Sequence, residues 1–182
     1  GIRAEVVKFS GDDPDITNGV SVFTTVEICD DLNTIEFHAG EGVGTVTKRG
    51  MSLPVGEPSI NNGPRTLIRN VVAEMTGRED FGARITISIP AGVELAKKTL
   101  NPVLGIEGGI SVIGTTGVLR PMSEEAFKDS LVPQIDVALA EGQDVLVFVP
   151  GKIGERIALA LGIPQSAVIE TSNFIGFMLD SA

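Results

Sequence analysis

Two segments in the second half of the chain have the same three parts in the same order: a short apolar run, a turn with glycines and the start of a helix. The first, residues 108–127, reads GGISVIGTTGVLRPMSEEAF, and the second, residues 144–155, reads DVLVFVPGKIGE. A strand that passes through a glycine turn into a helix is the building unit of a parallel α/β sheet. Turns of this kind lie at the carboxyl ends of the strands, where backbone N–H groups are free and ligands bind. An ordinary tight connection between a strand and a helix is the alternative.

The glycine turns and one later turn supply the candidate ligand contacts of the second half. Ser172 and Asn173 follow a further predicted strand, residues 168–170, and begin the last predicted helix. Gly151 and Lys152 resemble the start of a phosphate-binding loop, but Ile153 stands where that motif needs Ser or Thr. The turns themselves contribute Gly114, Thr115, Thr116, Gly117, Gly151 and Gly154.

The first half of the chain has the pattern of an α+β domain. Residues 3–9, 20–29 and 83–89 are predicted strands, and residues 34–38 are expected to return on 20–29 as a hairpin. Residues 65–76 carry an apolar stripe with helical spacing and are followed by Gly77, a residue that commonly ends helices. Turn formers gather at residues 101–109. We therefore expect an α+β sheet domain over 1–103 and a truncated, Rossmann-like doubly wound domain over 104–182.

Composition narrows the function classes. The 182 residues carry 14 Lys and Arg against 24 Asp and Glu, a net charge of −10, which argues against nonspecific nucleic-acid binding. With Cys29 as the one cysteine and His38 as the one histidine, neither an internal disulfide nor a His/Cys metal site is expected. No apolar run is longer than that of residues 145–149, which is far too short to cross a membrane. These features suit a cytoplasmic protein, and a chain that starts at Gly1 suggests the interior of a longer gene product.

Three further features leave alternatives open. Asp12, Asp13 and Asp15 surround Pro14, either as a solvated turn that caps backbone N–H groups or as carboxylates that bind substrate or accept a proton. Glycines at every second position of residues 40–44 permit close approach by a ligand or by another chain segment. Arg65 and a second arginine one helical turn later form either solvated surface charge or an anion clamp.

Four long strings resemble the CbiD family, the cobalt-precorrin-5B C1-methyltransferases of anaerobic cobalamin (vitamin B12) biosynthesis. They are GDDPDITNG at 11–19, GEGVGTVTKRGMSLPVGEPSIN at 40–61, ELAKKTLNPVLGIEGGISVIGTTGVLRPMSEEA at 94–126 and SNFIGFML at 172–179. The chain departs from the family pattern at Asn62-Gly63, where the family usually has proline after Asn61, and at Asn18, where it often has histidine. The family's usual Thr-Thr-Gly-Thr-Cys-Ala segment is not in this sequence. The resemblance implies methyl transfer from S-adenosyl-L-methionine to ring carbon C1 of a cobalt-containing corrinoid.

This resemblance also implies roles for the candidate residues. The transfer is an in-line displacement that needs no protein nucleophile and no protein metal site. Asp13 and Asp15 are the candidates for taking a proton that the macrocycle releases. The expected cofactor contacts are Gly114, Thr115, Thr116, Gly117, Gly151, Gly154, Ser172 and Asn173, and the expected corrinoid contacts, in a cleft between the two domains, are Asp12, Lys48, Arg65 and Arg120.

Two other functions remain as alternatives. One is a noncatalytic corrinoid- or nucleotide-binding module that carries an intermediate between enzymes. The other is a phosphate-binding α/β enzyme that uses Gly151 and Lys152. The expected partner in the favoured case is the small-molecule corrinoid, with no nucleic acid and no membrane, and self-association into a homo-oligomer is left open.

Overall fold

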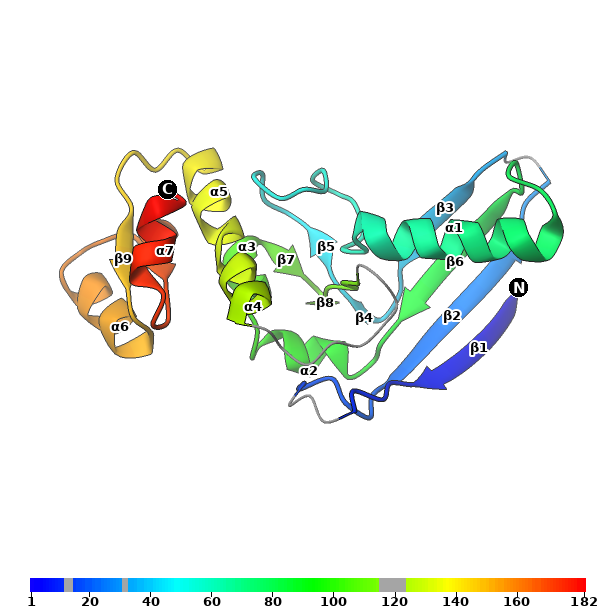
Figure 1. The fold of residues 1–182 in the computed structure, drawn as a ribbon, viewed down its shortest axis with the longest axis horizontal. Helices are drawn as coiled ribbons and strands as arrows, with labels where there is room; N and C mark the ends of the chain where they lie inside the picture. The colour runs from blue at the N-terminus through cyan, green and yellow to red at the C-terminus, as the bar shows by residue number, and fades with distance from the viewer. Residues whose placement is uncertain (12–14, 31–32, 115–123) are drawn as a thin grey trace. The chain divides into compact units, whose positions relative to one another are not determined.

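The structure, a computed structural model, describes residues 1–11, 15–30, 33–114 and 124–182 (Figure 1). It is a mixed α/β protein whose chain forms two compact units. The first unit comprises Gly1–Thr47 and Val55–Pro121, and the second comprises Lys48–Pro54 and Met122–Ala182. Each unit has its own sheet and its own helices.

A four-stranded sheet forms the body of the first unit. Its strands are β1 (Ile2–Val7), β2 (Ser21–Ile28), β3 (Ile35–Ala39) and β6 (Ala83–Ser88), in the spatial order β1-β2-β6-β3. Strand β2 is antiparallel to β1 and β6, whereas β3 is parallel to β6. The predicted hairpin between residues 20–29 and 34–38 is therefore wrong. The strand with buried Ile85 and Ile87 takes the central position between them, because there both of its edges are paired and its apolar face is covered.

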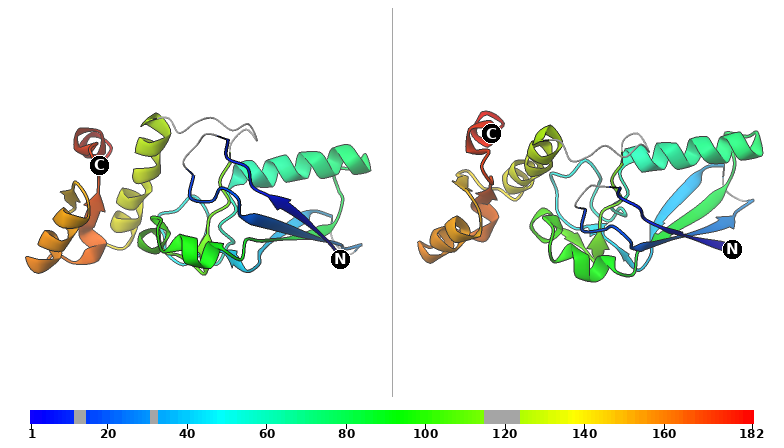
Figure 2. Two further views of the ribbon diagram at one scale, coloured as in Figure 1. Left: turned by 90° about the horizontal axis from the view of Figure 1, so that it is seen from below. Right: turned by 60° about the horizontal axis from the view of Figure 1, so that its bottom comes forward.

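Helix α1 (Asn62–Thr76) lies along one face of this sheet (Figures 1 and 2). Ile68 and Val72 of the helix pack against the buried core that the strands provide. The helix ends at Gly77, as the sequence predicts, with a left-handed φ of 68° and its N–H donating to the Ala73 carbonyl. Only part of the predicted apolar stripe is covered, since Met75 near the helix end is exposed.

Short strands and helices pack close to the end of the sheet. They are β4 (Gly42–Val43), β5 (Thr45–Val46), α2 (Gly92–Ala96), α3 (Asn101–Leu104), β7 (Ile106–Glu107) and β8 (Gly109–Ile110). Strand β4 pairs in parallel with β8, and β5 pairs antiparallel with β7. These pairings keep the residues after 103 in the first unit, so the two units divide at Pro121 and Met122 rather than at 103 and 104.

The glycines of residues 40–44 admit a neighbouring chain segment. A Cβ on Gly42 would overlap the carbonyl oxygen of Ile89, and a Cβ on Gly92 or on Gly109 would overlap the backbone of Gly42. Backbones this close leave no space for a side chain. Of the two alternatives that the sequence left open for these glycines, the structure shows the second.

The second unit is built on a parallel pair of strands, β9 (Val147–Val149) and β10 (Val168–Glu170). Helix α6 (Lys152–Ala160) connects them, followed by a 3-10 turn at Gln165–Ala167. Helices α4 (Glu124–Leu131), α5 (Pro133–Ala140) and α7 (Ile175–Asp180) complete the unit. The break between α4 and α5 falls directly before Pro133, which confirms the predicted kink. The order strand, glycine turn, helix, strand is also as predicted.

None of the helices in the described residues combines the length and the hydropathy that a membrane crossing requires.

Candidate functional site

The carboxyl ends of β9 and β10 bring two predicted turns to one edge of the second unit. Strand β9 runs into Pro150 and Gly151, and β10 runs into Thr171 and Ser172. The Thr171 N–H donates to the Val149 carbonyl at 2.8 Å, and its hydroxyl donates to the same oxygen at 3.1 Å. Because the strands are parallel and their ends are tied together, the two turns lie side by side. This edge is where ligands bind in open α/β sheets.

Gly151 has a backbone conformation that only glycine adopts readily. Its φ is 144° and its ψ is −167°. A Cβ at this position would lie 3.9 Å from Oε1 of Glu170, so the glycine leaves open space beside that carboxylate. Gly151 also precedes α6, and within the described residues no side chain caps the N-terminus of this helix. The partial positive charge of that helix end is therefore directed at the turn.

Gly154 has a packing role in the same turn. A Cβ there would lie 2.9 Å from Cβ of Val149 and 3.1 Å from Cδ of Pro150. The glycine thus lets α6 lie directly against the end of β9, as the last glycine of dinucleotide-binding turns does. Its predicted role in holding the cofactor stays a prediction.

Lys152 is held by two carboxylates. Its Nζ lies 2.9 Å from Oε2 of Glu155 and 2.9 Å from Oε2 of Glu170. The hydrogen bond with Glu170, followed by the one with Glu155, raises the pKa of Lys152, so the ammonium stays charged. One cation between two anions gives this edge a net negative charge. Such an edge suits a neutral or cationic ligand better than a phosphate.

The backbone of Glu170 is clamped by Gln134, a residue that the sequence analysis missed. Gln134 projects from α5 and is buried. Its Nε2 donates to the Glu170 carbonyl at 3.0 Å and to the Leu131 carbonyl at 3.1 Å, and its Oε1 accepts from the Glu170 N–H at 3.1 Å. A single amide within the mostly apolar segment 133–140 was the available signal. Buried amides of this kind are retained where they satisfy backbone groups.

Glu170 itself was also missed as a site residue. It ends β10 and follows Gly151 by 19 residues. The spacing was visible in the sequence, but its meaning depends on the parallel pairing of β9 with β10. Its carboxylate lies at the same edge as the two predicted turns.

Ser172 and Asn173 lie in the turn that follows β10, and their contact with a cofactor stays a prediction. Ser172 has a φ of 52°, which makes it the one non-glycine residue with a positive φ in the described parts of the chain. The turn is anchored by Phe174, whose ring meets that of Phe127 with the centroids 5.8 Å apart. Lys128 of α4 lies over the Phe174 ring at 5.0 Å. The packing of Phe174 therefore holds the backbone directly after Ser172 and Asn173 in place.

The acidic turn of the first unit joins β1 to β2, and of its three carboxylates the structure describes Asp15. Oδ1 of Asp15 accepts hydrogen bonds from the Thr17 N–H at 2.7 Å and from the Thr17 hydroxyl at 2.6 Å. Its Oδ2 forms an ion pair with Lys8. Partial burial raises the pKa of Asp15, but the hydrogen bonds from Lys8 and Thr17 outweigh it and lower the pKa to about 2. For Asp15 the capping interpretation applies, and a carboxylate with this pKa is a weak proton acceptor.

Arg65 is bonded within its own loop. Its Nε donates to the Ile60 carbonyl at 2.7 Å, and its Nη2 donates to Glu57 at 2.9 Å and to the Pro58 carbonyl at 3.1 Å. These contacts hold the loop that opens α1. A substrate carboxylate that bound at Nη2 would have to replace that of Glu57.

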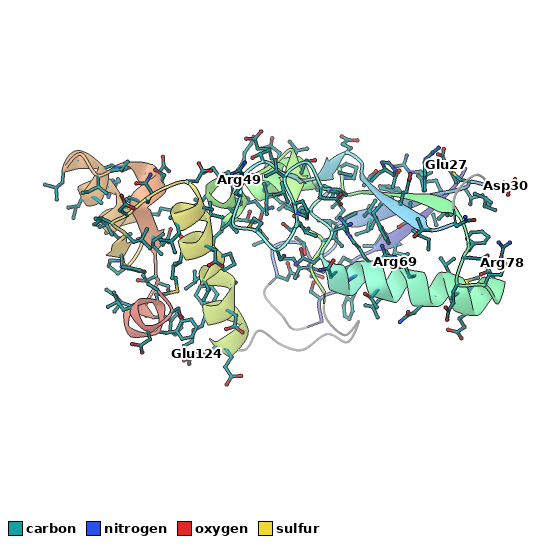
Figure 3. All side chains as sticks on the ribbon, turned by 90° about the horizontal axis from the view of Figure 1, so that it is seen from above. Glu27, Asp30, Arg49, Arg69, Arg78 and Glu124 are labelled. Atoms are coloured by element: carbon teal, nitrogen blue, oxygen red, sulfur yellow. The ribbon has the colours of Figure 1, made fainter. Side chains whose placement is uncertain are left out.

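The second arginine of this pair, Arg69, projects from α1 toward β3 (Figure 3). The ζ carbons of Arg65 and Arg69 lie 5.4 Å and 5.0 Å from the ring centroid of Phe37. The ring face thus adds to the hydrogen bonds that hold Arg65, and it is a contact of Arg69 as well. Arg69 is exposed, which is consistent with its interpretation as a surface charge.

The predicted site residues are divided between the two units. Gly114 belongs to the first unit, where a Cβ would lie 3.8 Å from Cγ of Pro64 at the start of α1. Lys48 belongs to the second unit, apart in sequence from Arg65 in the first. Outside the described residues lie Asp12, Asp13, Thr115, Thr116, Gly117 and Arg120. Within the described ranges, no three His, Cys, Asp or Glu side chains are grouped so as to hold a metal ion.

Comparison with known proteins gives consistent matches. A family model described as CbiD matches residues 1–121. A cobalt-precorrin-5B C(1)-methyltransferase from Moorella thermoacetica is 51% identical over 180 residues, which is 98% of this chain and 48% of that protein. The protein of the same name from Methanocaldococcus jannaschii is 52% identical over 181 residues, or 99% of this chain and 50% of that protein. The chain thus spans about half the length of the curated relatives it matches.

A solved structure shows the same similarity. The crystal structure of the cobalamin biosynthesis protein CbiD from Archaeoglobus fulgidus matches with a TM-score of 0.50 and 27% sequence identity. The match covers 98% of this chain and 57% of that one. Both units therefore have counterparts in a known fold.

Proposed function

Because the chain belongs to the CbiD family, we propose that it is part of a cobalt-precorrin-5B C1-methyltransferase acting in anaerobic cobalamin biosynthesis. In this proposal S-adenosyl-L-methionine is the methyl donor and C1 of the corrinoid is the acceptor. The similarity to proteins of that name extends over nearly all of the 182 residues, at about half identity. We also expect the protein to act in the cytoplasm on this small-molecule substrate, without nucleic acid, as a monomer or as a homo-oligomer.

The charge of the β9–β10 edge is the observation that supports S-adenosyl-L-methionine as the methyl donor. S-adenosyl-L-methionine has a sulfonium cation and no phosphate. Glu155 and Glu170 outnumber Lys152 at this edge, so its field attracts a cation and opposes a phosphate. This supports the methyltransferase over the phosphate-binding enzyme that Gly151 and Lys152 suggested. We take β9, α6 and β10 as part of a Rossmann-like doubly wound domain with its ligand edge here.

The residues at the edge have separate tasks in this proposal. Gly151 leaves space for the donor, and the uncapped N-terminus of α6 receives its carboxylate. Ser172 and Asn173 supply polar contacts from the neighbouring turn. Bound there, the donor supplies a methyl group on a good leaving group, so the chain contributes alignment and exclusion of water. Gly154 positions the helix, and Gly114, Thr115, Thr116 and Gly117 remain predicted contacts of the cofactor.

For the corrinoid, the basic residues retain their predicted roles. Lys48, Arg65 and Arg120 are the candidates for pairing with its acidic side arms, and Asp12 for a polar contact. Of the two proposed proton acceptors, we favour Asp13, because the carboxylate of Asp15 already accepts hydrogen bonds from Thr17 and pairs with Lys8.

Calorimetric titration with S-adenosyl-L-methionine tests this function. It is carried out on the complete product of the gene and on the 182-residue chain. We expect binding that Gly151→Val weakens by at least about tenfold, because the side chain fills the space beside Glu170. The matched control is Gly142→Val, at a glycine with φ of 84° and no atom within 4 Å of its Cβ position, which should leave affinity within about twofold.

A turnover assay with cobalt-precorrin-5B follows the titration. With S-adenosyl-L-methionine below saturation, methylated corrinoid should form about tenfold more slowly with the Gly151→Val variant than with the unmodified gene product. Binding of the corrinoid without any binding of S-adenosyl-L-methionine would contradict the proposal and favour the noncatalytic carrier.

A further inference from the structure

Glu170 lies where nucleotide-binding α/β folds place an acidic residue. In those folds a carboxylate about 20 residues after the glycine turn, at the end of the next parallel strand, accepts a hydrogen bond from a ribose hydroxyl. Here the glycine turn is at Gly151, the next parallel strand is β10, and its last residue is Glu170, 19 residues later. Gly151 also leaves space beside this carboxylate, since a Cβ at that position would lie 3.9 Å from Oε1 of Glu170 and near no other neighbouring atom.

The backbone of Glu170 is fixed more firmly than its side chain. Gln134 bonds both its N–H and its carbonyl, and β9 pairs with it at Val149. A ligand-binding carboxylate on a rigid strand end is presented with little loss of conformational entropy. Gln134 is buried, so the clamp does not depend on the ligand.

The carboxylate of Glu170 can exchange its partner at low cost. Its partner in the structure is Lys152, whose side chain is 69% exposed. Because water reaches the exposed Lys152 ammonium, this ion pair contributes less to stability than a fully buried pair would, although the Glu170 side chain is only 28% exposed. Lys152 also has a second carboxylate, Glu155, at 2.9 Å, so it remains paired when Glu170 turns to a ligand.

We propose that Glu170 is a specificity-determining residue that accepts hydrogen bonds from the vicinal 2′- and 3′-hydroxyls of a ribonucleoside, with Lys152 as its partner in the absence of ligand. An ionised carboxylate is purely an acceptor with two oxygens, and a vicinal diol offers two O–H donors. A 2′-phosphate would be repelled by Glu170 and Glu155 together. This inference rests on the proposed function, because it assigns the adenosine part of the donor to the same edge.

The test compares S-adenosylhomocysteine with its 2′-deoxy analogue by calorimetry on the complete gene product. We expect the unmodified protein to bind the ribose compound about 10- to 100-fold more tightly, the effect of a hydrogen bond to a charged group. Glu170→Gln should reduce this preference to about threefold or less, mainly by weakening binding of the ribose compound.

Glu155→Gln is the matched control. It removes the same charge and the other partner of Lys152, but it should leave the preference for ribose unchanged. Equal binding of the two compounds by the unmodified protein, or equal loss of preference in both variants, would overturn the role of Glu170 and leave the proposed function standing. Failure to bind either adenosyl compound would contradict the proposed function itself, and this inference with it.

Discussion

Gly42 in the first unit and Gly151 in the second have opposite roles. In the first unit, Gly42, Gly92 and Gly109 fill a contact between backbones in which a single added carbon would overlap its neighbours. In the second unit, Gly151 opens a turn toward a carboxylate. In the sequence both groups appear as glycine-rich turns near strand ends.

The difference teaches how to separate a packing glycine from a binding one. A packing glycine has backbone on the side that its Cβ would occupy, and the cost of adding that carbon is paid in stability. A binding glycine has open space and a functional group beyond that side, so adding a side chain should lower the affinity for the ligand. A substitution at Gly42 is therefore expected to reduce stability, and one at Gly151 to reduce ligand affinity.

The largest expected effect is at Gly42. Gly42→Ala combines a φ of 76° with an overlap of the Ile89 carbonyl, so it should lower the free energy of unfolding by about 3–5 kcal/mol. Far-UV circular dichroism in a urea titration is a suitable measurement, because the chain has no Trp or Tyr to report by fluorescence.

Gly77→Ala is the matched control in the same unit. Its φ of 68° imposes the same strain, but no atom lies within 4 Å of the Cβ position, so the loss should be about 1–2 kcal/mol. Equal losses of unfolding free energy in the two variants would show that the backbone contact at Gly42 does not contribute to stability.

The next effect concerns the polar clamp of the second unit. Gln134→Leu leaves the N–H and the carbonyl of Glu170 without their side-chain partner in a buried place, and should cost about 2 kcal/mol. Hydrogen exchange followed by mass spectrometry should show faster exchange in β10 and unchanged exchange in β6. The matched control is Gln165→Leu at an exposed position, which should change hydrogen exchange in neither strand. Unchanged exchange in β10 of the Gln134→Leu variant would show that Gln134 does not stabilise this strand.

The smallest effect is at Asp15 and depends on pH. Its folded pKa of about 2 is below the ordinary value of 3.8, so its stabilisation is present above pH 3.8 and is lost as the pH falls toward 2. Asp15→Asn should therefore cost about 1 kcal/mol at pH 7, a figure that allows for screening by solvent, and nothing near pH 2.

Urea titrations of both proteins between pH 2 and pH 7 check this prediction. Asp80→Asn, which alters an exposed pair with Arg78, is the control and should have little effect at any pH. Loss of turnover by Asp15→Asn with unchanged stability at pH 7 would instead assign Asp15 to catalysis.

The second unit was the more predictable of the two. Its strands, the break at Pro133 and the turn at Gly151 follow from local patterns of apolar residues, proline and glycine. The site was predicted only in outline. Ser172 and Asn173 were named from the sequence as candidates, but Glu170 and Gln134 were not, because they are brought together by a parallel strand pairing and a buried amide that connect distant segments.

The sequence by itself determined the positions of most strands and helices and the family of the chain. Periodicity, turn residues and long strings that resemble one family are all local features of a sequence. Tertiary structure decided that β6 lies between β2 and β3. It also decided that Gly42 packs against the backbone of Ile89, whereas Gly151 leaves space beside Glu170. It also decided that Arg65 holds its own loop. These outcomes depend on which distant backbones approach one another, and that is governed by the total apolar surface buried and by the pairing of every buried polar group.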